Sequence, residues 1–130
     1  MAEARIAVMG AAGRMGLTLV RAIAATPGLV ISGATEQLGS IALGEDVGQL
    51  AGVGKRNVRI TDDVAAVIGS CDALLDFTAP AATVVFAGLA ASHGKVHVIG
   101  TTGCTAEHDE AIAEAAKRAT IVKAGNMSLG

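Results

Sequence analysis

The stretch Gly10-Ala11-Ala12-Gly13-Arg14-Met15-Gly16 decides the expected fold of this chain, because of what stands on either side of it. A short apolar run, Ile6-Ala7-Val8-Met9, precedes it, and a helical pattern follows over residues 14–25. A strand, a glycine turn and a helix N-terminus together form a site for a pyrophosphate. The glycines let the backbone approach the ligand, and the helix N-terminus presents free N–H groups and a positive dipole end. The spacing Gly-x-x-Gly-x-x-Gly keeps the outer glycines of the familiar Gly-x-Gly-x-x-Gly pattern.

An acidic residue supports this interpretation. Glu36 stands twenty residues after Gly16 and follows a second apolar run, Leu29-Val30-Ile31. At about 20 residues from the glycine turn, a dinucleotide-binding fold places the carboxylate that accepts hydrogen bonds from the adenosine ribose. The turn and the carboxylate together predict a dinucleotide site.

Composition favours one α/β domain. The chain has 130 residues, of which 52% are hydrophobic and only 2% aromatic, and it contains 17 glycines. This length suits a single domain, and the composition suits buried parallel strands beneath alanine-rich helices. A net charge of −2 gives no electrostatic reason to expect nucleic acid or an anionic membrane as a partner. Because the sequence shows neither a signal peptide nor a membrane-spanning run, we expect a soluble, cytoplasmic protein.

The cysteines and histidines indicate neither a disulfide framework nor a metal site. Cys71 and Cys104 are too few for a disulfide scaffold, so free thiols in a reducing compartment are expected. The histidines show no metal-ligand spacing with either cysteine. His97 lies inside an apolar run and is expected to be a packed strand residue.

Apolar runs of strand length alternate with helical patterns along the chain. The six apolar runs lie at residues 5–9, 29–34, 58–60, 72–76, 96–99 and 120–123. The helical patterns cover residues 14–25, 62–69, a segment from Pro80, and 105–118. This alternation predicts a Rossmann-like, doubly wound parallel sheet of about six strands. The glycine-rich segment 37–57 interrupts the rhythm, and we expect a surface excursion there with one short helical turn.

Small, hydroxyl and amide residues follow most of the predicted strands. These loops are Gly10–Gly16, Thr35–Gln37, Asp76–Pro80, Gly100–Gly103 and Ala124–Ser128. Open α/β sheets bind their ligands at the carboxyl ends of the strands, so we expect the five loops to form one site. Each loop taken alone is also explained by the turn preferences of Gly, Thr, Asn and Asp.

In this order, four motifs resemble those of the dihydrodipicolinate reductase family: Gly-Ala-Ala-Gly-Arg-Met-Gly, Asp-Phe-Thr-Ala-Pro, Gly-Thr-Thr-Gly and Ala-Gly-Asn-Met-Ser-Leu-Gly. The resemblance implies an oxidoreductase of diaminopimelate and lysine biosynthesis. Such an enzyme transfers hydride from NADH or NADPH to a cyclic imine-type dicarboxylate, converting dihydrodipicolinate to tetrahydrodipicolinate. The resemblance covers the whole chain, but only the family's N-terminal, nucleotide-binding domain.

Residues 1–130 are therefore expected to form one dinucleotide-binding domain that lacks the C-terminal substrate and oligomerisation domain. The family's substrate segment, a His-His pair followed by a Lys and an Asp-x-Pro-Ser-Gly stretch, does not occur before Gly130. We expect this piece to bind cofactor without catalysing the reaction. The resemblance further implies a monomer here and a homo-oligomer for the full-length protein, where the dicarboxylate would also bind.

The resemblance also implies which residues contact the cofactor. The pyrophosphate would lie on Gly10, Ala11, Ala12, Gly13, Arg14 and Met15. Glu36, with Gln37 beside it, would bind the adenosine ribose, and Phe77 and Thr78 would flank the stretch from pyrophosphate to ribose. The nicotinamide half would contact Gly100, Thr101 and Thr102, with Ala124, Gly125, Asn126 and Met127 closing over its amide.

The residue after the acidic position bears on the choice of cofactor. Family members that favour NADPH commonly carry an Arg there, whereas this sequence has Gln37. A 2′-phosphate about 4 Å from Glu36 would be repelled by about 1 kcal/mol in water and about 4 kcal/mol at an effective dielectric constant of about 20. Arg14 is the only basic residue in these motifs that could compensate. We expect NADH to be used at least as well as NADPH.

Other nucleotide-binding enzymes lack key residues in this sequence. A short-chain dehydrogenase needs a Tyr-x-x-x-Lys pair, and the chain has no tyrosine. Gly52-Val53-Gly54-Lys55 suggests a P-loop, but Gln49 stands at the first glycine position and Arg56 replaces the Ser or Thr. A methyltransferase needs no anion site at a helix N-terminus. A stand-alone nucleotide-sensing regulatory domain with the same fold remains an alternative, because fold alone does not fix function.

Overall fold

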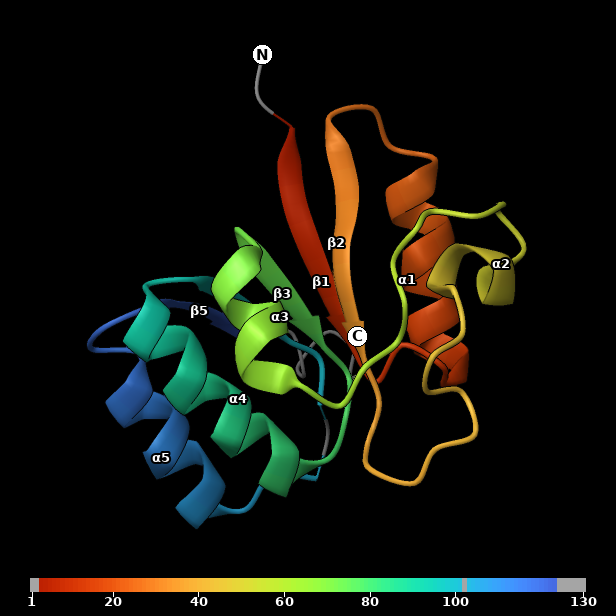
Figure 1. Ribbon diagram of the computed structural model, residues 1–130. Coiled ribbons are helices and arrows are strands. Elements are labelled where there is room, and N and C mark those ends of the chain that lie inside the picture. The colour runs from red at the N-terminus through yellow and green to blue at the C-terminus, as the bar shows by residue number, and fades with distance from the viewer. Residues whose placement is uncertain (1–2, 102, 124–130) are drawn as a thin grey trace, which may run out of the picture.

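The computed structural model describes residues 3–101 and 103–123. Its centre is a five-stranded, fully parallel sheet with the strand order β2-β1-β3-β4-β5. The strands are β1 (Ala4–Met9), β2 (Leu29–Thr35), β3 (Ala73–Asp76), β4 (Val96–Ile99) and β5 (Thr120–Lys123). The helices are α1 (Arg14–Ala24), α2 (Val47–Ala51), α3 (Val64–Ser70), α4 (Pro80–His93) and α5 (Ala106–Ala115). Figure 1 shows how these elements are arranged.

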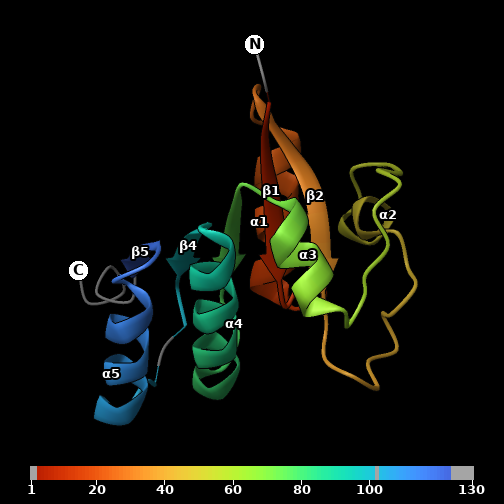
Figure 2. The same ribbon diagram turned by 60° about the vertical axis from the view of Figure 1, so that its left-hand side comes forward.

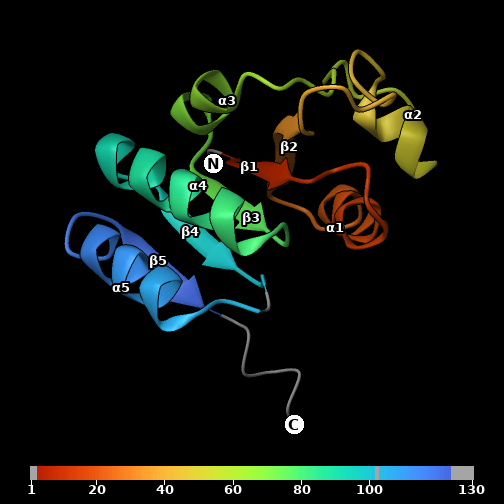
Figure 3. The ribbon, with the colours of Figure 1, turned by 90° about the horizontal axis from the view of Figure 1, so that it is seen from below.

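Helices cover both faces of the sheet, which confirms the doubly wound arrangement. Alternate residues of a strand point to opposite faces, and β1 shows this directly. Ile6 and Val8 pack with α1 and α2, whereas Ala7 and Met9 pack with α3 and α4. Figure 2 shows α4 and α5 as neighbouring helices, and Figure 3 shows α1 and α2 at the other side of the molecule. Strand β1 is therefore buried on both sides, as its continuous apolar sequence predicts.

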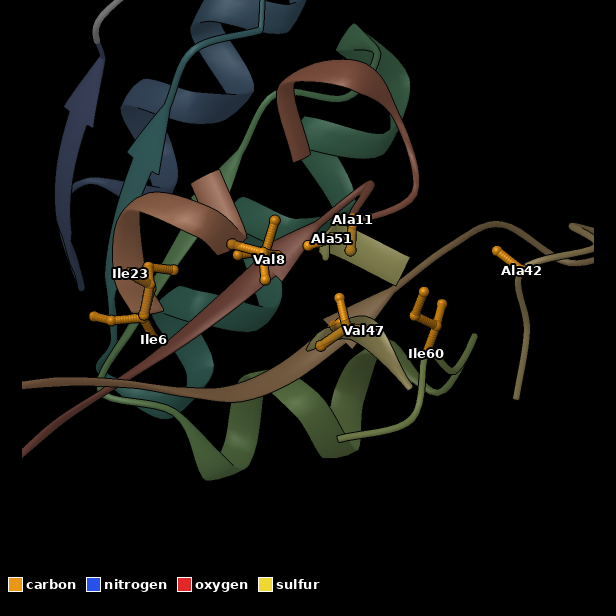
Figure 4. Packing of buried hydrophobic residues seen from close by; sticks show 10 residues of the cluster. Ile6, Val8, Ala11, Ile23, Ala42, Val47, Ala51 and Ile60 are labelled. Carbon is orange, nitrogen blue, oxygen red and sulfur yellow. The ribbon is translucent and has the colours of Figure 1, made fainter. Parts of the chain in front are cut away.

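The core is built from small aliphatic side chains. Figure 4 shows the cluster between β1, α1 and α2, in which Val8, Val47 and Ala11 are fully buried. A second cluster joins α3 and α4 to the sheet, and a third joins α4 and α5. Large aromatic residues contribute little, because Phe86 is the one aromatic side chain in the core of the described residues.

The predicted strand at 58–60 is wrong. The segment forms only an isolated bridge, Arg59 with Asp46, and Thr61 just after it bridges Thr35, the last residue of β2. Its apolar character has another cause: Ile60 is buried in the core cluster with α1 and α2, and its N–H donates to the Glu45 carbonyl. The segment therefore closes the preceding loop onto the core instead of adding a sixth strand to the sheet.

Segment 37–57 contains the expected short helix, and part of the segment packs on the core. It contains α2, which packs against α1, and Arg21 of α1 donates a hydrogen bond to the Ala51 carbonyl at 3.2 Å. The carboxylate of Asp46 accepts hydrogen bonds from the N–H groups of Gln49, Arg56 and Val58 at 3.0, 3.0 and 3.2 Å. These backbone hydrogen bonds, led by that from Arg56, lower the pKa of Asp46 despite its desolvation. One side chain thus caps α2 and ties its start to residues 56–58 at the end of the segment.

Both cysteines are free thiols. Cys71 is buried at the end of α3, where its Sγ donates to the Ile68 carbonyl at 3.3 Å, and burial raises the pKa of its thiol. Among the described residues, no helix is long and apolar enough to cross a membrane. The same residues contain no group of three or more His, Cys, Asp or Glu side chains placed to hold a metal ion.

Candidate dinucleotide site

The glycine turn joins the end of β1 to the start of α1. Gly10 adopts a φ of +74°, a left-handed conformation that a residue with a side chain rarely adopts. The N–H groups of Gly10 and Ala11 both donate to the Thr35 carbonyl at the end of β2, each at 3.0 Å. Helix α1 begins after Gly13, which offers no side-chain cap to the first N–H groups. The start of α1 therefore keeps backbone donors for an anion.

Gly16 lets α1 sit directly on this turn. A Cβ atom at Gly16 would overlap the carbonyl oxygen of Gly10 and lie 2.7 Å from the Cα of Ala11. Such contacts are shorter than packed atoms allow, so only glycine fits here. The last glycine of the motif thus has a packing role, which is the role expected of the third glycine in dinucleotide-binding turns.

Glu36 lies against the glycine turn. Its Oε2 accepts a hydrogen bond from the N–H of Ala12 at 2.9 Å, and its own N–H donates to the Thr61 carbonyl at 3.1 Å. The Glu36 side chain is half-buried, whereas Gln37 and Arg14 are exposed. The carboxylate is consequently fixed beside the turn with further acceptor capacity available.

A cleft of about 540 Å³ opens beside Glu36. Hydroxyl, amide and carboxyl groups stand at one end of it, and mostly aliphatic side chains form the rest of the wall. The lining residues are Gly10, Thr35, Glu36, Gln37, Leu38, Asp62, Val64, Thr78, Ala79, Ala82, Val85 and Phe86. This combination of apolar walls and a few placed polar groups is typical of small-molecule sites.

Sequence reasoning missed the apolar wall. Ala82, Val85 and Phe86 line the cleft from the first turns of α4, and Leu38 and Val64 line it from the neighbouring segments. The spacing of 82, 85 and 86 places these residues on one helix face, which was a usable signal. Which face of α4 meets the cleft depends on how the helix packs on the sheet, and that is a tertiary property.

The loop after β3 also packs on the glycine turn. A Cβ atom at Gly10 would lie 2.9 Å from the Cγ2 of Thr78, so the two loops are in close contact. Gly100, at the end of β4, donates its N–H to the Asp76 carbonyl at 2.8 Å. A Cβ atom at Gly100 would overlap the ring of Phe77. The loops after β1, β3 and β4 thus form one continuous surface.

Beneath these loops lies a buried, hydrogen-bonded pair of side chains. Nε2 of His97 is 2.9 Å from Oδ2 of Asp76, and both side chains are completely buried. Burial alone would raise the pKa of Asp76, but hydrogen bonds from His97 and Thr78 outweigh it and hold that pKa below its usual value. The expected burial of His97 is confirmed, but its partner was not foreseen. Strand order places β3 beside β4, and sequence spacing does not give strand order.

The structure brings most of the predicted site residues together at the carboxyl edge of β1 to β4. These are Gly10, Ala11, Ala12, Gly13, Arg14, Met15, Glu36, Gln37, Phe77, Thr78, Gly100 and Thr101. Five predicted positions, Thr102, Ala124, Gly125, Asn126 and Met127, lie outside the described residues.

A parallel sheet with helices on both faces and a glycine turn after its first strand defines the class of Rossmann-like α/β domains. Solved structures share this fold. Dipicolinate-bound dihydrodipicolinate reductase from Paenisporosarcina sp. TG-14 superimposes with a TM-score of 0.74 and 19% identity, covering 98% of this chain and 49% of that chain. Biliverdin reductase from Synechocystis sp. PCC 6803, in complex with biliverdin and NADP+, superimposes with a TM-score of 0.70 and 16% identity. The match covers 98% of this chain and 39% of that chain.

The family follows from sequence comparison. The family model described as the N-terminus of dihydrodipicolinate reductase matches residues 4–127. The chain belongs to this family. It is 56% identical over 125 residues to 4-hydroxy-tetrahydrodipicolinate reductase of Brucella abortus (strain 2308), covering 96% of this chain and 47% of the relative. It is 57% identical to 4-hydroxy-tetrahydrodipicolinate reductase 1 of Mesorhizobium japonicum, and that match covers 96% of this chain and 46% of the relative. The chain thus spans about half the length of these curated relatives.

Proposed function

We propose that this domain binds a nicotinamide dinucleotide across the carboxyl edge of β1 to β4. The pyrophosphate would lie on residues 10–15, at the uncapped start of α1. The adenosine half would occupy the 540 Å³ cleft, with its base against the aliphatic wall from α4. The nicotinamide half would extend over Phe77, Gly100 and Thr101.

One observation carries the proposal. The Glu36 carboxylate lies within hydrogen-bonding distance of the glycine turn, through Ala12, and lines the cleft at the same time. A carboxylate in this place can accept hydrogen bonds from both hydroxyls of a ribose whose phosphate sits on the turn. The donor set and the apolar wall therefore fit a dinucleotide better than they fit a free phosphate or a free base.

The choice between the two cofactors depends on charge at the ribose. The Glu36 carboxylate repels a 2′-phosphate, and Gln37 beside it brings no positive charge to offset this. Arg14 is exposed at the start of α1 and is the basic side chain of the glycine motif. We propose that NADH binds at least as well as NADPH.

For the whole protein we propose the reaction that the relatives' names carry, a pyridine-nucleotide-dependent reduction of a cyclic imine-type dicarboxylate in the route to diaminopimelate and lysine. The bound dinucleotide would supply the hydride. The residues described here would bind it, orient it and exclude water from its adenosine half. The dicarboxylate site and the contacts between subunits would both lie in the family's C-terminal domain. Residues 1–130 alone would therefore be inactive and monomeric. A cytoplasmic location is part of this proposal.

The test is a calorimetric titration of this 130-residue chain with NADH and, separately, with NADPH. Micromolar binding of NADH, at least as tight as that of NADPH, is expected. Glu36→Gln is the matched variant, because it keeps the size of the side chain and removes its charge. It should weaken NADH more than NADPH. Failure of the wild-type chain to bind either nucleotide would overturn the proposal.

A further inference from the structure

A cluster of buried polar side chains underlies the loops that follow β3 and β4. In the part of the chain that the structure describes, six polar or charged residues are buried. Four of these six belong to this one cluster: Asp76, Thr83, His97 and Thr101. Buried polar groups are costly unless they are paired, so their concentration at one place calls for a reason.

The Asp76 carboxylate is the centre of the cluster. Its Oδ1 accepts hydrogen bonds from Thr78, at 2.6 Å from the hydroxyl and 3.2 Å from the N–H. The Thr101 hydroxyl lies 3.3 Å from the same Oδ1, and the Thr78 N–H lies 3.2 Å from the Thr101 hydroxyl oxygen. One carboxylate oxygen therefore holds the loop after β3 and the loop after β4 at a fixed spacing.

His97 holds the other carboxylate oxygen. Its Nε2 lies 2.9 Å from Oδ2 of Asp76, and its Nδ1 has no hydrogen-bond partner among the described residues. A carboxylate only accepts hydrogen bonds, so the proton is on Nε2. Nε2 is therefore the donor aimed at Oδ2, and this contact turns Oδ1 toward Thr78 and Thr101.

Thr83 completes the arrangement from α4. Its hydroxyl donates to the Thr101 hydroxyl oxygen at 2.7 Å, which leaves the Thr101 proton to point at Asp76. The hydrogen bonds thus converge on the Asp76 carboxylate, from α4 through Thr101 on one side and from His97 of β4 on the other. Core filling alone does not require such a network, because apolar side chains of similar volume fill a core at least as well.

We propose that His97 is a positioning residue for dinucleotide binding, which acts through Asp76 to hold the loops at 77–79 and 100–101 for the nicotinamide half of the ligand. The proposal rests on the proposed function. The adenosine half is held by Glu36 and the glycine turn, whose contacts do not pass through His97. Because Thr78 and Ala79 also line the adenosine cleft, loss of the His97 donor should weaken contacts to the nicotinamide half more than contacts to the adenosine half.

The experiment compares two ligands with three proteins. NADH probes both halves of the site, and ADP probes only the adenosine and pyrophosphate half. His97→Leu removes the donor with little change in volume, and His97→Gln keeps an N–H donor for Oδ2 of Asp76. His97→Leu should lower the affinity for NADH about tenfold or more and change the affinity for ADP less than about twofold. His97→Gln should restore most of the NADH affinity.

Every result of this comparison either supports or overturns the positioning role of His97. Equal losses for NADH and ADP, no loss for NADH, or failure of His97→Gln to restore binding would overturn the positioning role. If His97→Leu does not fold, Thr83→Val replaces it, because it removes one hydroxyl from the chain without changing shape. Thr83→Val should also weaken NADH and spare ADP, and equal effects on both would overturn the proposal. Failure of the wild-type chain to bind NADH overturns the proposed function itself and this inference with it.

Nitrogen NMR of the imidazole gives a readout that needs no ligand. The wild-type chain should show His97 with a proton on Nε2. Asp76→Asn presents an amide donor to Nε2 and should move the proton to Nδ1. A wild-type ring that carries its proton on Nδ1 would overturn the inference whether or not nucleotide binds.

Discussion

Glu36 and Ala12 are joined by a hydrogen bond of 2.9 Å, from the N–H of Ala12 to Oε2 of the carboxylate. The bond connects the end of β2 to the glycine turn after β1, although the two residues are 24 positions apart in the chain. It fixes a negative charge beside the start of α1, where a phosphate would also be favoured. We therefore expect the local charge balance at this point to influence which phosphates the proposed site accepts.

Gln37→Arg should shift the preference toward NADPH. Gln37 is exposed and lines the cleft next to Glu36, so an arginine there can reach a 2′-phosphate and offset the carboxylate. We expect NADPH affinity to rise about tenfold, with NADH affinity changed less than about threefold. Gln37→Met, an uncharged control, should leave the ratio unchanged. An unchanged ratio in Gln37→Arg would place the 2′ position elsewhere.

Gly16→Ala should destabilise the domain and abolish nucleotide binding. The added methyl group overlaps the Gly10 carbonyl, so α1 must move away from the turn, and overpacking of this kind costs about 1–3 kcal/mol. Gly88→Ala is the control, because Gly88 lies in α4 with no atom within 4 Å of an added Cβ. That variant should gain about 0.5–1 kcal/mol in helix stability and bind normally. Urea unfolding and calorimetry measure both effects, and similar results for the two variants would contradict the prediction.

Gly100→Ala should be rescued by a smaller residue at position 77. The new methyl group overlaps the Phe77 ring, so the single variant should lose about 1–3 kcal/mol of unfolding free energy. In a Phe77→Leu background the same change should cost less, by about 0.5 kcal/mol or more. A double-mutant cycle of urea unfolding tests this. Additive free energies would show that the ring and position 100 do not interact.

The acid stability of the domain should depend on Asp76. Burial opposes the shift, but the hydrogen bonds from His97 and Thr78 prevail and hold the folded-state pKa of Asp76 below its usual value. The group therefore stabilises the fold above its unfolded pKa, and this stabilisation is lost as pH falls through the folded pKa. In Asp76→Asn, the unfolding free energy should decline less between about pH 5 and about pH 3 than in the wild type.

Urea unfolding at several pH values measures this difference. Part of the decline should remain in the variant, because hydrogen bonds also lower the pKa values of Asp46 and Asp72. Parallel declines in the two proteins would show that Asp76 contributes nothing to acid unfolding.

Local signals predicted most of the elements. The strands at the five observed positions and the main helices agree with their apolar runs to within a few residues. Thr105 illustrates why. Its hydroxyl accepts from the His108 N–H and caps α5, as a Thr before a helical pattern predicts. Capping, turn geometry and periodicity act over a few residues, so the sequence contains them directly.

The predicted strand at 58–60 shows where such signals fail. Ile60 is as buried as a strand residue, but it is buried by α2 and the core cluster, not by a neighbouring strand. An apolar run indicates that a segment is buried, but it does not indicate which element covers the segment. The polar side chain that organises this region, Asp46, caps α2 and bonds residues ten and twelve positions away.

Local patterns in the chain were enough to predict the glycine turn, the acidic residue after the second strand and the alternation of strands with helices. The strand order required the folded structure, and so did the pairing of Asp76 with His97 and the meeting of α4 with the cleft. Parallel neighbours in a sheet come from distant parts of the chain. Their order follows from how the helices cover both faces at once, which no single stretch of sequence specifies.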